Sequence, residues 1–212
     1  MRTDRSIAVA AHRGAHEHEA QNSLAAYRAA VELGCDYIEI DLRTAGDGSL
    51  RIKHDKIAAG DVLPTFDEVL ELAKGRIGIY LDVKDAMPAA IIGAVERFGM
   101  RSQILTYAGF LLQKELVQLR PGWPCLPEAM SVEGTRNIIA ALKPPAVALS
   151  SQLNVEVIAV AKAAGCGVIA DRLGKNDNEA GWQAALDAGV TGIQTDKPTA
   201  LLAWLRAQKL HA

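Results

Sequence analysis

The sequence predicts a (β/α)8 barrel, an α/β fold, that forms one compact domain over residues 1–212. Apolar strand patterns alternate with amphipathic helix patterns about eight times, which is typical of a parallel sheet wrapped by helices. A chain of 212 residues is long enough for one sizeable core. A doubly wound open sheet is the alternative, but Gly14-Ala15-His16-Glu17 lacks the glycine spacing of a dinucleotide-binding loop.

Each strand is recognised by a short apolar run, and each helix by apolar residues that recur every three to four positions. Gly46-Asp47-Gly48 marks a turn into 50–54, a short antiparallel or continuation strand. Thr65 and Glu68 have the spacing of a capping box. The expected strands are 7–11, 37–42, 50–54, 77–83, 103–106, 123–126, 146–149, 167–170 and 190–195. The expected helices are 22–33, 64–73, 88–98, 110–119, 132–142, 154–164, 179–188 and 198–208.

The composition limits the class of protein. A formal net charge of −2 indicates neither nucleic acid nor an anionic membrane surface as a partner. No stretch reaches the roughly 18 apolar residues of a membrane span, and no signal-like segment is present, so we expect a cytoplasmic location. Cys35, Cys125 and Cys166 have no metal-type spacing and are expected to be buried free thiols. The pattern does not predict an oligomeric state.

Ionisable and polar side chains gather at the ends of nearly all expected strands, where a barrel of this type has its active site. The first three clusters, taken in chain order, are His12 with Arg13, Glu39 with Asp41, and His54 with Asp55. The later strands end in Asp82 with Lys84, then Ser150 with Gln152, Asp171 with Arg172, and Gln194 with Asp196.

The acidic residues of these clusters predict a metal site. Glu39 and Asp41 are two residues apart, so on a strand they point to the same face. Adjacent carboxylates repel each other unless a cation or protons neutralise them. Asp82, on the neighbouring strand, would complete a triad, and such oxygen ligands suit Mg²⁺, Ca²⁺ or Mn²⁺.

Cationic side chains and imidazoles extend this pattern to a site for phosphoryl transfer. Arg13 and Lys84 are candidates to bind a phosphate oxygen, and the histidines His12 and His54 accompany the carboxylates. Other residues are expected to have structural or solvated positions. We expect Asp196 to cap the last helix, Arg43, Asp55 and Arg172 to have structural roles, and His16, His18 and His211 to be solvated.

An ordered set of motifs resembles the glycerophosphodiester phosphodiesterase family along nearly the whole chain. The motifs are His12-Arg13-Gly14, Asn22, the run 34–41, Asp47-Gly48, His54-Asp55, Leu63-Pro64-Thr65, Asp82-Val83-Lys84 and Thr195-Asp196-Lys197-Pro198. The resemblance implies a (β/α)8 barrel, one divalent cation and two histidines for acid–base catalysis. By position it assigns catalysis to His12 and His54, and metal binding to Glu39, Asp41 and Asp82.

The chain departs from the family pattern at three places. Ala20-Gln21 stands where the family usually has Pro-Glu, and Asp82 stands where many members have Glu. Only 56–63 separates the His-Asp pair from the next helix, where members that cleave glycerophosphodiesters usually carry a substantial insertion. Because that insertion shapes the glycerol pocket in the family, this chain is expected to have a shallow, wide opening.

The expected function is metal-dependent hydrolysis of a small-molecule phosphodiester, giving glycerol phosphate and an alcohol. One alternative is a diesterase similar to sphingomyelinase D or lysophospholipase D, which forms a cyclic phosphate. Others are a barrel that binds a phosphorylated ligand without turnover and a hydrolase that uses metal-bound water. Candidate pocket residues for the alcohol are Gln152, Asp171, Trp182 and Gln194.

Overall fold

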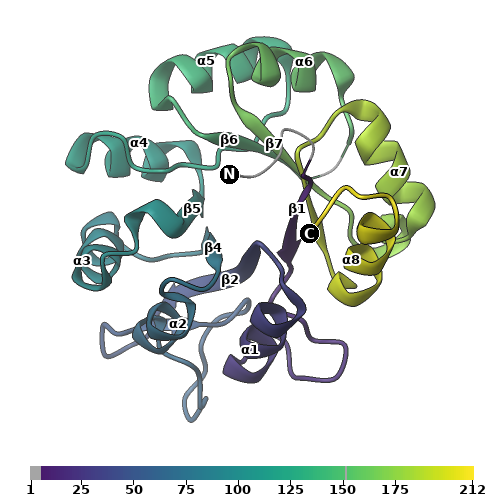
Figure 1. The fold of residues 1–212 in the computed structure, drawn as a ribbon. Helices are drawn as coiled ribbons and strands as arrows, with labels where there is room; N and C mark the ends of the chain where they lie inside the picture. The colour runs from purple at the N-terminus through teal and green to yellow at the C-terminus, as the bar shows by residue number, and fades with distance from the viewer. Residues whose placement is uncertain (1–5, 151) are drawn as a thin grey trace.

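The computed structural model describes residues 6–150 and 152–212 and confirms the barrel. A ring of helices surrounds the strands (Figure 1). The strands are β1 (Ala8–Ala11), β2 (Tyr37–Thr44), β3 (Leu50–Ile52), β4 (Gly78–Val83), β5 (Ile104–Tyr107), β6 (Ala146–Leu149), β7 (Gly167–Asp171) and β8 (Gly192–Thr195). The helices are α1 (Leu24–Leu33), α2 (Phe66–Ala73), α3 (Pro88–Phe98), α4 (Phe110–Leu119), α5 (Val132–Leu142), α6 (Val155–Ala163), α7 (Glu179–Ala188) and α8 (Pro198–Ala207).

Seven strands form a parallel sheet in the order β5-β4-β2-β1-β8-β7-β6. β1 pairs with both β2 and β8, so the first and last strands of the chain are neighbours. The register pairs Ala11 with Thr195, which brings the segments that follow these two strands together at one end of the barrel.

The gap between β5 and β6 is closed by the segment 124–129, which overlaps the expected strand 123–126. This segment makes single bridges, from Cys125 to Thr106 and from Glu128 to Ala148, rather than a continuous ladder. Pro124 and Pro127 explain the interruption, because proline has no N–H to donate to a neighbouring strand. Both proline carbonyls still accept hydrogen bonds, from the amides of Thr106 and Ala148.

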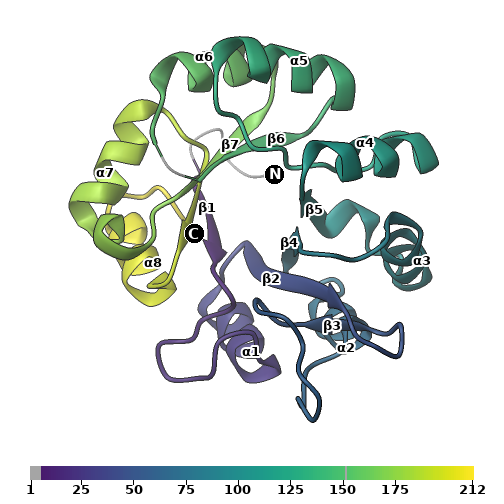
Figure 2. The same ribbon diagram turned by 180° about the vertical axis from the view of Figure 1, so that it is seen from behind.

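β3 is antiparallel to β2 and lies outside the order of the barrel strands (Figure 2). Of the two alternatives for 50–54, the antiparallel strand is therefore correct. The next helix begins as expected, because the Thr65 hydroxyl accepts from the amide of Glu68 and the Glu68 carboxylate accepts from the amide of Thr65. The loop 56–63 between them is mostly exposed. It therefore adds little cover to the end of the barrel.

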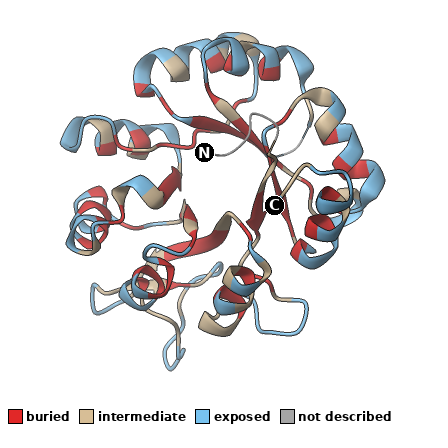
Figure 3. Ribbon diagram, in the orientation of Figure 1, coloured by how far each residue is buried: buried red, intermediate tan, exposed pale blue. Residues whose placement is uncertain are grey.

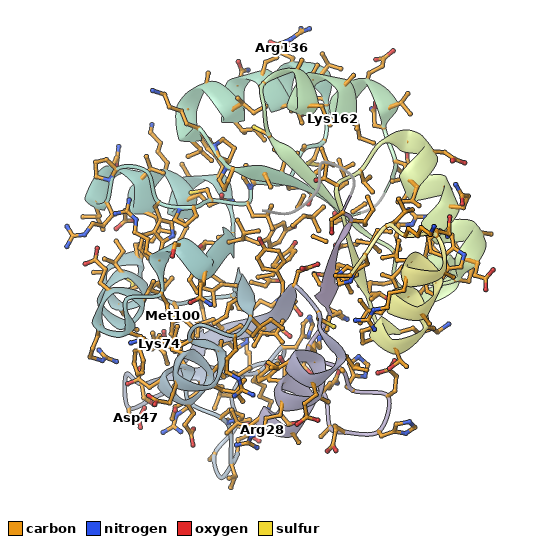
Figure 4. The ribbon with its side chains drawn as sticks, in the orientation of Figure 1. Arg28, Asp47, Lys74, Met100, Arg136 and Lys162 are labelled. Atoms are coloured by element: carbon orange, nitrogen blue, oxygen red, sulfur yellow. The ribbon has the colours of Figure 1, made fainter. Side chains whose placement is uncertain are left out.

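The core has two layers, which follow the alternation of side chains along the strands. Outward-facing strand residues pack against the helices, and burial is concentrated on the strands and the inner helix faces (Figure 3). Arg28 and Arg136 project outward from α1 and α5 (Figure 4). Inside the barrel, a smaller cluster contains Ala10, Tyr80, Leu105, Leu126, Ala146, Ala148 and Ile169. Strand residues that face the same way as this inner cluster, but lie nearer the carboxyl ends of the strands, belong to the candidate site.

Two expectations about single residues are settled by burial. Cys35, Cys125 and Cys166 are free and buried, as expected. The expectation that His211 is solvated is wrong, because its side chain is only 6 % exposed and its Nε2 lies 3.1 Å from Asp36 Oδ2.

None of the helices in the described residues has the length and apolar character needed to cross a membrane.

Candidate active site

Three carboxylates meet at the carboxyl ends of β2 and β4. Parallel pairing places Asp41 level with Asp82, and Glu39 lies two residues before Asp41 on the same face. One oxygen of each carboxylate lies within 4.8 Å of those of the other two. Glu39 and Asp41 are 2 % and 1 % exposed. The structure therefore brings the three predicted metal ligands together.

The electrostatics of this cluster favour a bound cation. Burial raises the pKa of Glu39, and the charges of Asp41 and Asp82 raise that pKa further. Burial also raises the pKa of Asp82, although the hydrogen bond from Lys84 offsets part of this rise. Buried carboxylates that repel each other are stabilised by a positive ion, and an all-oxygen donor set fits Mg²⁺ or Ca²⁺.

The two candidate phosphate-binding cations lie against these carboxylates. Lys84 Nζ is 2.7 Å from Asp82 Oδ2 and 3.0 Å from Asp41 Oδ1. Burial opposes the charge of Lys84, but its bonds to the two carboxylates outweigh burial and raise its pKa. Arg13 Nε lies 3.1 Å from Asp41 Oδ2 as an ion pair without hydrogen-bond geometry. Both cations would thus stand beside a phosphate that reached the cluster.

A tight turn after β1 holds Arg13 in this place. Arg13 and Gly14 both have positive φ, 54° and 85°. A side chain at Gly14 would clash, since a Cβ there would lie 2.7 Å from Ala26 Cβ. The turn directs the amide of Arg13 to Glu39 Oε2 at 2.9 Å. The backbone of the His-Arg-Gly motif is therefore part of the site.

Asn22 belongs to the site rather than to the helix in which we expected it. It has a φ of 57°, a conformation that Asn tolerates better than most residues, and α1 begins after the N-cap Ser23. Its Nδ2 donates to Asp41 Oδ2 at 2.7 Å, and its Oδ1 accepts from the hydroxyl of Tyr27 at 2.9 Å. Asn22 thereby fixes the orientation of one predicted metal ligand.

The neighbouring Gln21, one of the departures from the family pattern, contacts Arg13. Its Oε1 accepts a hydrogen bond from Arg13 Nη1 at 2.9 Å. An amide oxygen at this position therefore still holds the guanidinium, although it does not add a negative charge.

His12 is oriented by a residue that we expected to be a helix cap. Its Nδ1 lies 2.6 Å from Asp196 Oδ1, and His16 Nε2 lies 3.2 Å from the same oxygen. The hydrogen bond from His12 lowers the pKa of Asp196, so this carboxylate is ionised and can only accept. Neutral His12 therefore carries its proton on Nδ1, and Nε2 faces Glu39 Oε2 at 3.9 Å. Neither the cap assignment for Asp196 nor the solvated position for His16 is correct.

His54 lies at the outer edge of the cluster. Its side chain is 48 % exposed, and its Nδ1 donates to Asp55 Oδ1 at 2.9 Å. Arg43 fixes the backbone beneath it, because Nε and Nη2 of Arg43 donate to the carbonyl of His54. The charge of His54 contributes to lowering the pKa of Asp82, so the two groups interact across the mouth.

The four candidate pocket residues lie in different environments. Asp171 and Gln194 are paired across β7 and β8 inside the barrel. Gln152 is exposed beyond β6. Trp182 is 3 % exposed in the helix layer, where its ring packs against Trp204 and its Nε1 donates to Asp177. The structure therefore does not bring Trp182 to the carboxylates.

Comparison with known proteins supports the resemblance read from the sequence. Residues 12–74 match the model of the Glycerophosphoryl diester phosphodiesterase family. A 48-residue stretch is 44 % identical to a Glycerophosphodiester phosphodiesterase of Caldanaerobacter subterraneus subsp. tengcongensis. That stretch covers 23 % of this chain and only 20 % of the relative.

Solved structures share the fold over nearly their whole length. A glycerophosphodiester phosphodiesterase from Agrobacterium tumefaciens aligns with a TM-score of 0.81 and 22 % identity, covering 93 % of this chain and 99 % of that one. A phosphodiesterase from Oleispira antarctica, solved with the product sn-glycerol-3-phosphate, gives a TM-score of 0.82 and 19 % identity over 94 % and 96 %. Residues 12–74, which carry His12, Glu39, Asp41 and His54, thus have the sequence pattern of the glycerophosphoryl diester phosphodiesterase family on a barrel that solved enzymes of that name share.

Proposed function

We propose that this protein is a metal-dependent phosphodiesterase that hydrolyses glycerophosphodiesters to glycerol phosphate and an alcohol. The observation that carries this proposal is the convergence of one carboxylate triad, two cationic side chains and an oriented histidine at one end of the barrel. The segment that matches the family contains four of these groups, His12, Arg13, Glu39 and Asp41. Asp82, Lys84 and the orienting Asp196 lie outside it.

Glu39, Asp41 and Asp82 would hold one divalent cation, Mg²⁺ or Ca²⁺, with Mn²⁺ as a further choice. A bound ion of this kind would offset the negative charge of the phosphate and make its phosphorus more electrophilic. Arg13 and Lys84 would bind the remaining non-bridging oxygens, the arginine through its planar fork.

The geometry supports different roles for the two histidines. His12, with its proton fixed on Nδ1 by Asp196, presents an unprotonated Nε2 that can remove a proton from the attacking hydroxyl or water. A bond then forms between that oxygen and phosphorus, and the bond from phosphorus to the leaving alcohol breaks. His54 is exposed enough to gain a proton from solvent, and we propose that it protonates the leaving oxygen.

The test is a panel of phosphodiesters incubated with Mg²⁺, Ca²⁺ or Mn²⁺, with products identified by ³¹P NMR. We expect glycerol phosphate from several glycerophosphodiesters, because the short loop 56–63 leaves the contacts concentrated on the phosphate. The spectra distinguish linear from cyclic phosphate. No product from any diester, with retained phosphate binding, would instead indicate a barrel that binds without turnover.

A second candidate, a lysophospholipase D-like diesterase, is favoured by an apolar rim on the same end of the barrel. Large exposed apolar side chains lie in the loops and first turns that follow strands, at Val62, Met87, Phe110, Leu111, Met130 and Val155. Leu111 and Met130 are 79 % and 82 % exposed. An acyl chain would cover such a rim. Faster hydrolysis of a lysophospholipid than of its deacylated counterpart would favour this candidate.

Asp196→Asn should lower kcat by roughly 10²-fold or more, because an amide no longer fixes the tautomer of His12. The fold should persist, since the substitution keeps the shape of the side chain. ¹⁵N NMR of the imidazole is the diagnostic measurement, and we expect a mixture of Nδ1–H and Nε2–H forms in the variant. An unchanged tautomer together with an unchanged rate would contradict a positioning role for Asp196.

A further inference from the structure

His12, His16 and Asp196 form a second cluster of ligand atoms beside the carboxylate triad. Asp196 Oδ1 lies 2.6 Å from Nδ1 of His12 and 3.2 Å from Nε2 of His16. One ligand atom of each residue lies within 4.8 Å of those of the other two, and the side chains are 17 %, 24 % and 34 % exposed. His16 lies outside the family motifs and has no part in the proposed mechanism. We call these three residues the histidine cluster.

The loop that carries His16 is anchored on both sides of it. The amide of Ala15, a buried residue, donates to a carbonyl of α1 at 3.0 Å. The carboxylate of Glu17 accepts from the amide of Thr199, in the first turn of α8, at 3.1 Å. The imidazole of His16 is therefore held in the cluster before any ligand binds, and a site whose ligands are already in place binds a metal at a lower cost.

Asp196 is anchored by a different acid. Its amide donates to Asp177 Oδ2 at 2.8 Å, and the hydroxyl of Thr195 donates to Asp177 Oδ1 at 2.6 Å. Asp177 itself is only 1 % exposed. The backbone of Asp196 is thus fixed by Asp177, while its own carboxylate points to two imidazoles. This is the arrangement of a ligand that a surrounding shell of hydrogen bonds keeps in position.

The donor set of the histidine cluster selects a different metal from the triad. Imidazole nitrogen suits Zn²⁺ and other late transition ions, whereas sites made only of oxygen suit Mg²⁺ and Ca²⁺. Zn²⁺ is often held by three protein ligands and a water, and the partly exposed side chains leave a side open for that water. Zinc–ligand bonds of about 2.1 Å place ligand atoms about 3.4 Å apart. The observed spacings of 2.6 Å and 3.2 Å therefore need only small side-chain movements.

We propose that the histidine cluster is an inhibitory Zn²⁺ site, separate from the metal site at the triad. Zn²⁺ bound to Nδ1 of His12 takes the place of the proton there, and Nε2 gains a proton from solvent. Nε2 is the nitrogen that faces Glu39 Oε2 at 3.9 Å, and once protonated it cannot accept the proton of the nucleophile. The inhibition rests on the proposed diesterase function, whereas zinc binding does not.

The first test measures hydrolysis of glycerophosphodiesters at a saturating concentration of the activating ion while zinc chloride is added. Zn²⁺ should inhibit the wild type, and His16→Ala should raise the half-inhibitory zinc concentration by about tenfold or more, since even an outer-shell partner of a metal is usually worth roughly 10–100-fold in affinity. Without zinc, His16→Ala should keep the wild-type rate.

His18→Ala is the matched control, because His18 is an exposed histidine two residues further along the same loop. It should keep the zinc sensitivity of the wild type. Equal inhibition of the wild type and His16→Ala would place the inhibitory ion elsewhere and overturn the proposal.

The second test follows zinc binding without turnover, in Glu39→Gln protein, whose triad is not expected to bind metal. ¹⁵N NMR of the imidazoles should show zinc-dependent shifts of His12 Nδ1 and His16 Nε2. Adding His16→Gln to this variant should weaken zinc binding, measured by calorimetry, although glutamine can still donate a hydrogen bond to Asp196. Melting temperatures confirm that the variants fold.

The two tests distinguish failure of the zinc site from failure of the diesterase function. The expected zinc-dependent shifts without hydrolysis of any diester would overturn the diesterase function and leave the zinc site standing. Hydrolysis without these shifts would overturn the zinc site and leave the diesterase function standing. Shifts in a protein that zinc does not inhibit would overturn the inhibitory role.

Discussion

Exhaustive chelation of divalent cations should abolish hydrolysis, and one of Mg²⁺, Ca²⁺ or Mn²⁺ should restore it. Glu39 and Asp41 are almost fully buried beside Asp82, so their charges favour a cation strongly and have little solvent to screen them. Glu39→Gln and Asp41→Asn should each remove metal binding, measured by calorimetry, and reduce activity to background. Full activity after chelation would exclude metal dependence.

The same substitutions separate metal binding from stability. Because burial and its acidic neighbours raise the pKa of Glu39, a neutral glutamine there relieves repulsion in the metal-free protein. We therefore expect the melting temperature of metal-free Glu39→Gln to be no lower than that of wild type. Metal affinity of the wild type should fall as pH decreases through the raised pKa, because the cation must then displace a proton. A large loss of stability in Glu39→Gln would indicate a structural role instead.

The carboxylates of the site that lie on strands could be predicted from the sequence, because side chains on a strand alternate between its two faces with a period of two residues. Glu39 and Asp41 are in phase on one strand, and the βα alternation makes Asp82 their neighbour, so the triad follows from local pattern and fold class together. The segment 123–126 is predicted only as a weak strand bounded by prolines, and the structure shows single bridges there rather than a continuous ladder.

The role of Asp196 depends on barrel closure. Its partner His12 is 184 residues away in sequence, and the two meet only because β8 pairs with β1. The predicted barrel already implied this contact, since closure of a barrel makes the first and last strands neighbours. Read alone, however, an acid before Lys197-Pro198 has the pattern of a helix cap.

Asn22 and Trp182 show the limits of residue type as a guide. Asn22 fits the start of a helix by sequence, but its positive φ and its bond to Asp41 are tertiary features that helix periodicity does not contain. Trp182 resembles a pocket aromatic, yet it lies on a helix, whose buried face packs on the outside of the barrel. Residues of the mouth come from strands and from the loops that follow them.

His12→Ala and His54→Ala should each lower kcat by roughly 10²–10⁴-fold on a natural diester, the usual worth of a positioned proton-transfer group. The rate of the wild type should follow a bell-shaped pH profile, because one histidine must be neutral and the other protonated. Either variant that keeps its rate within tenfold of wild type would remove that histidine from the mechanism.

A substrate with a better leaving group then separates the two histidines. If His54 protonates the leaving alcohol, a p-nitrophenyl phosphodiester should restore most of the rate of His54→Ala, because p-nitrophenolate leaves without a proton. The same substrate should not restore His12→Ala, since the nucleophile must still lose its proton to Nε2, which Asp196 keeps unprotonated in neutral His12. His16→Ala is the matched control, because His16 shares Asp196 but has no assigned proton transfer. Restoration of His12→Ala rather than His54→Ala would reverse the assignment of acid and base.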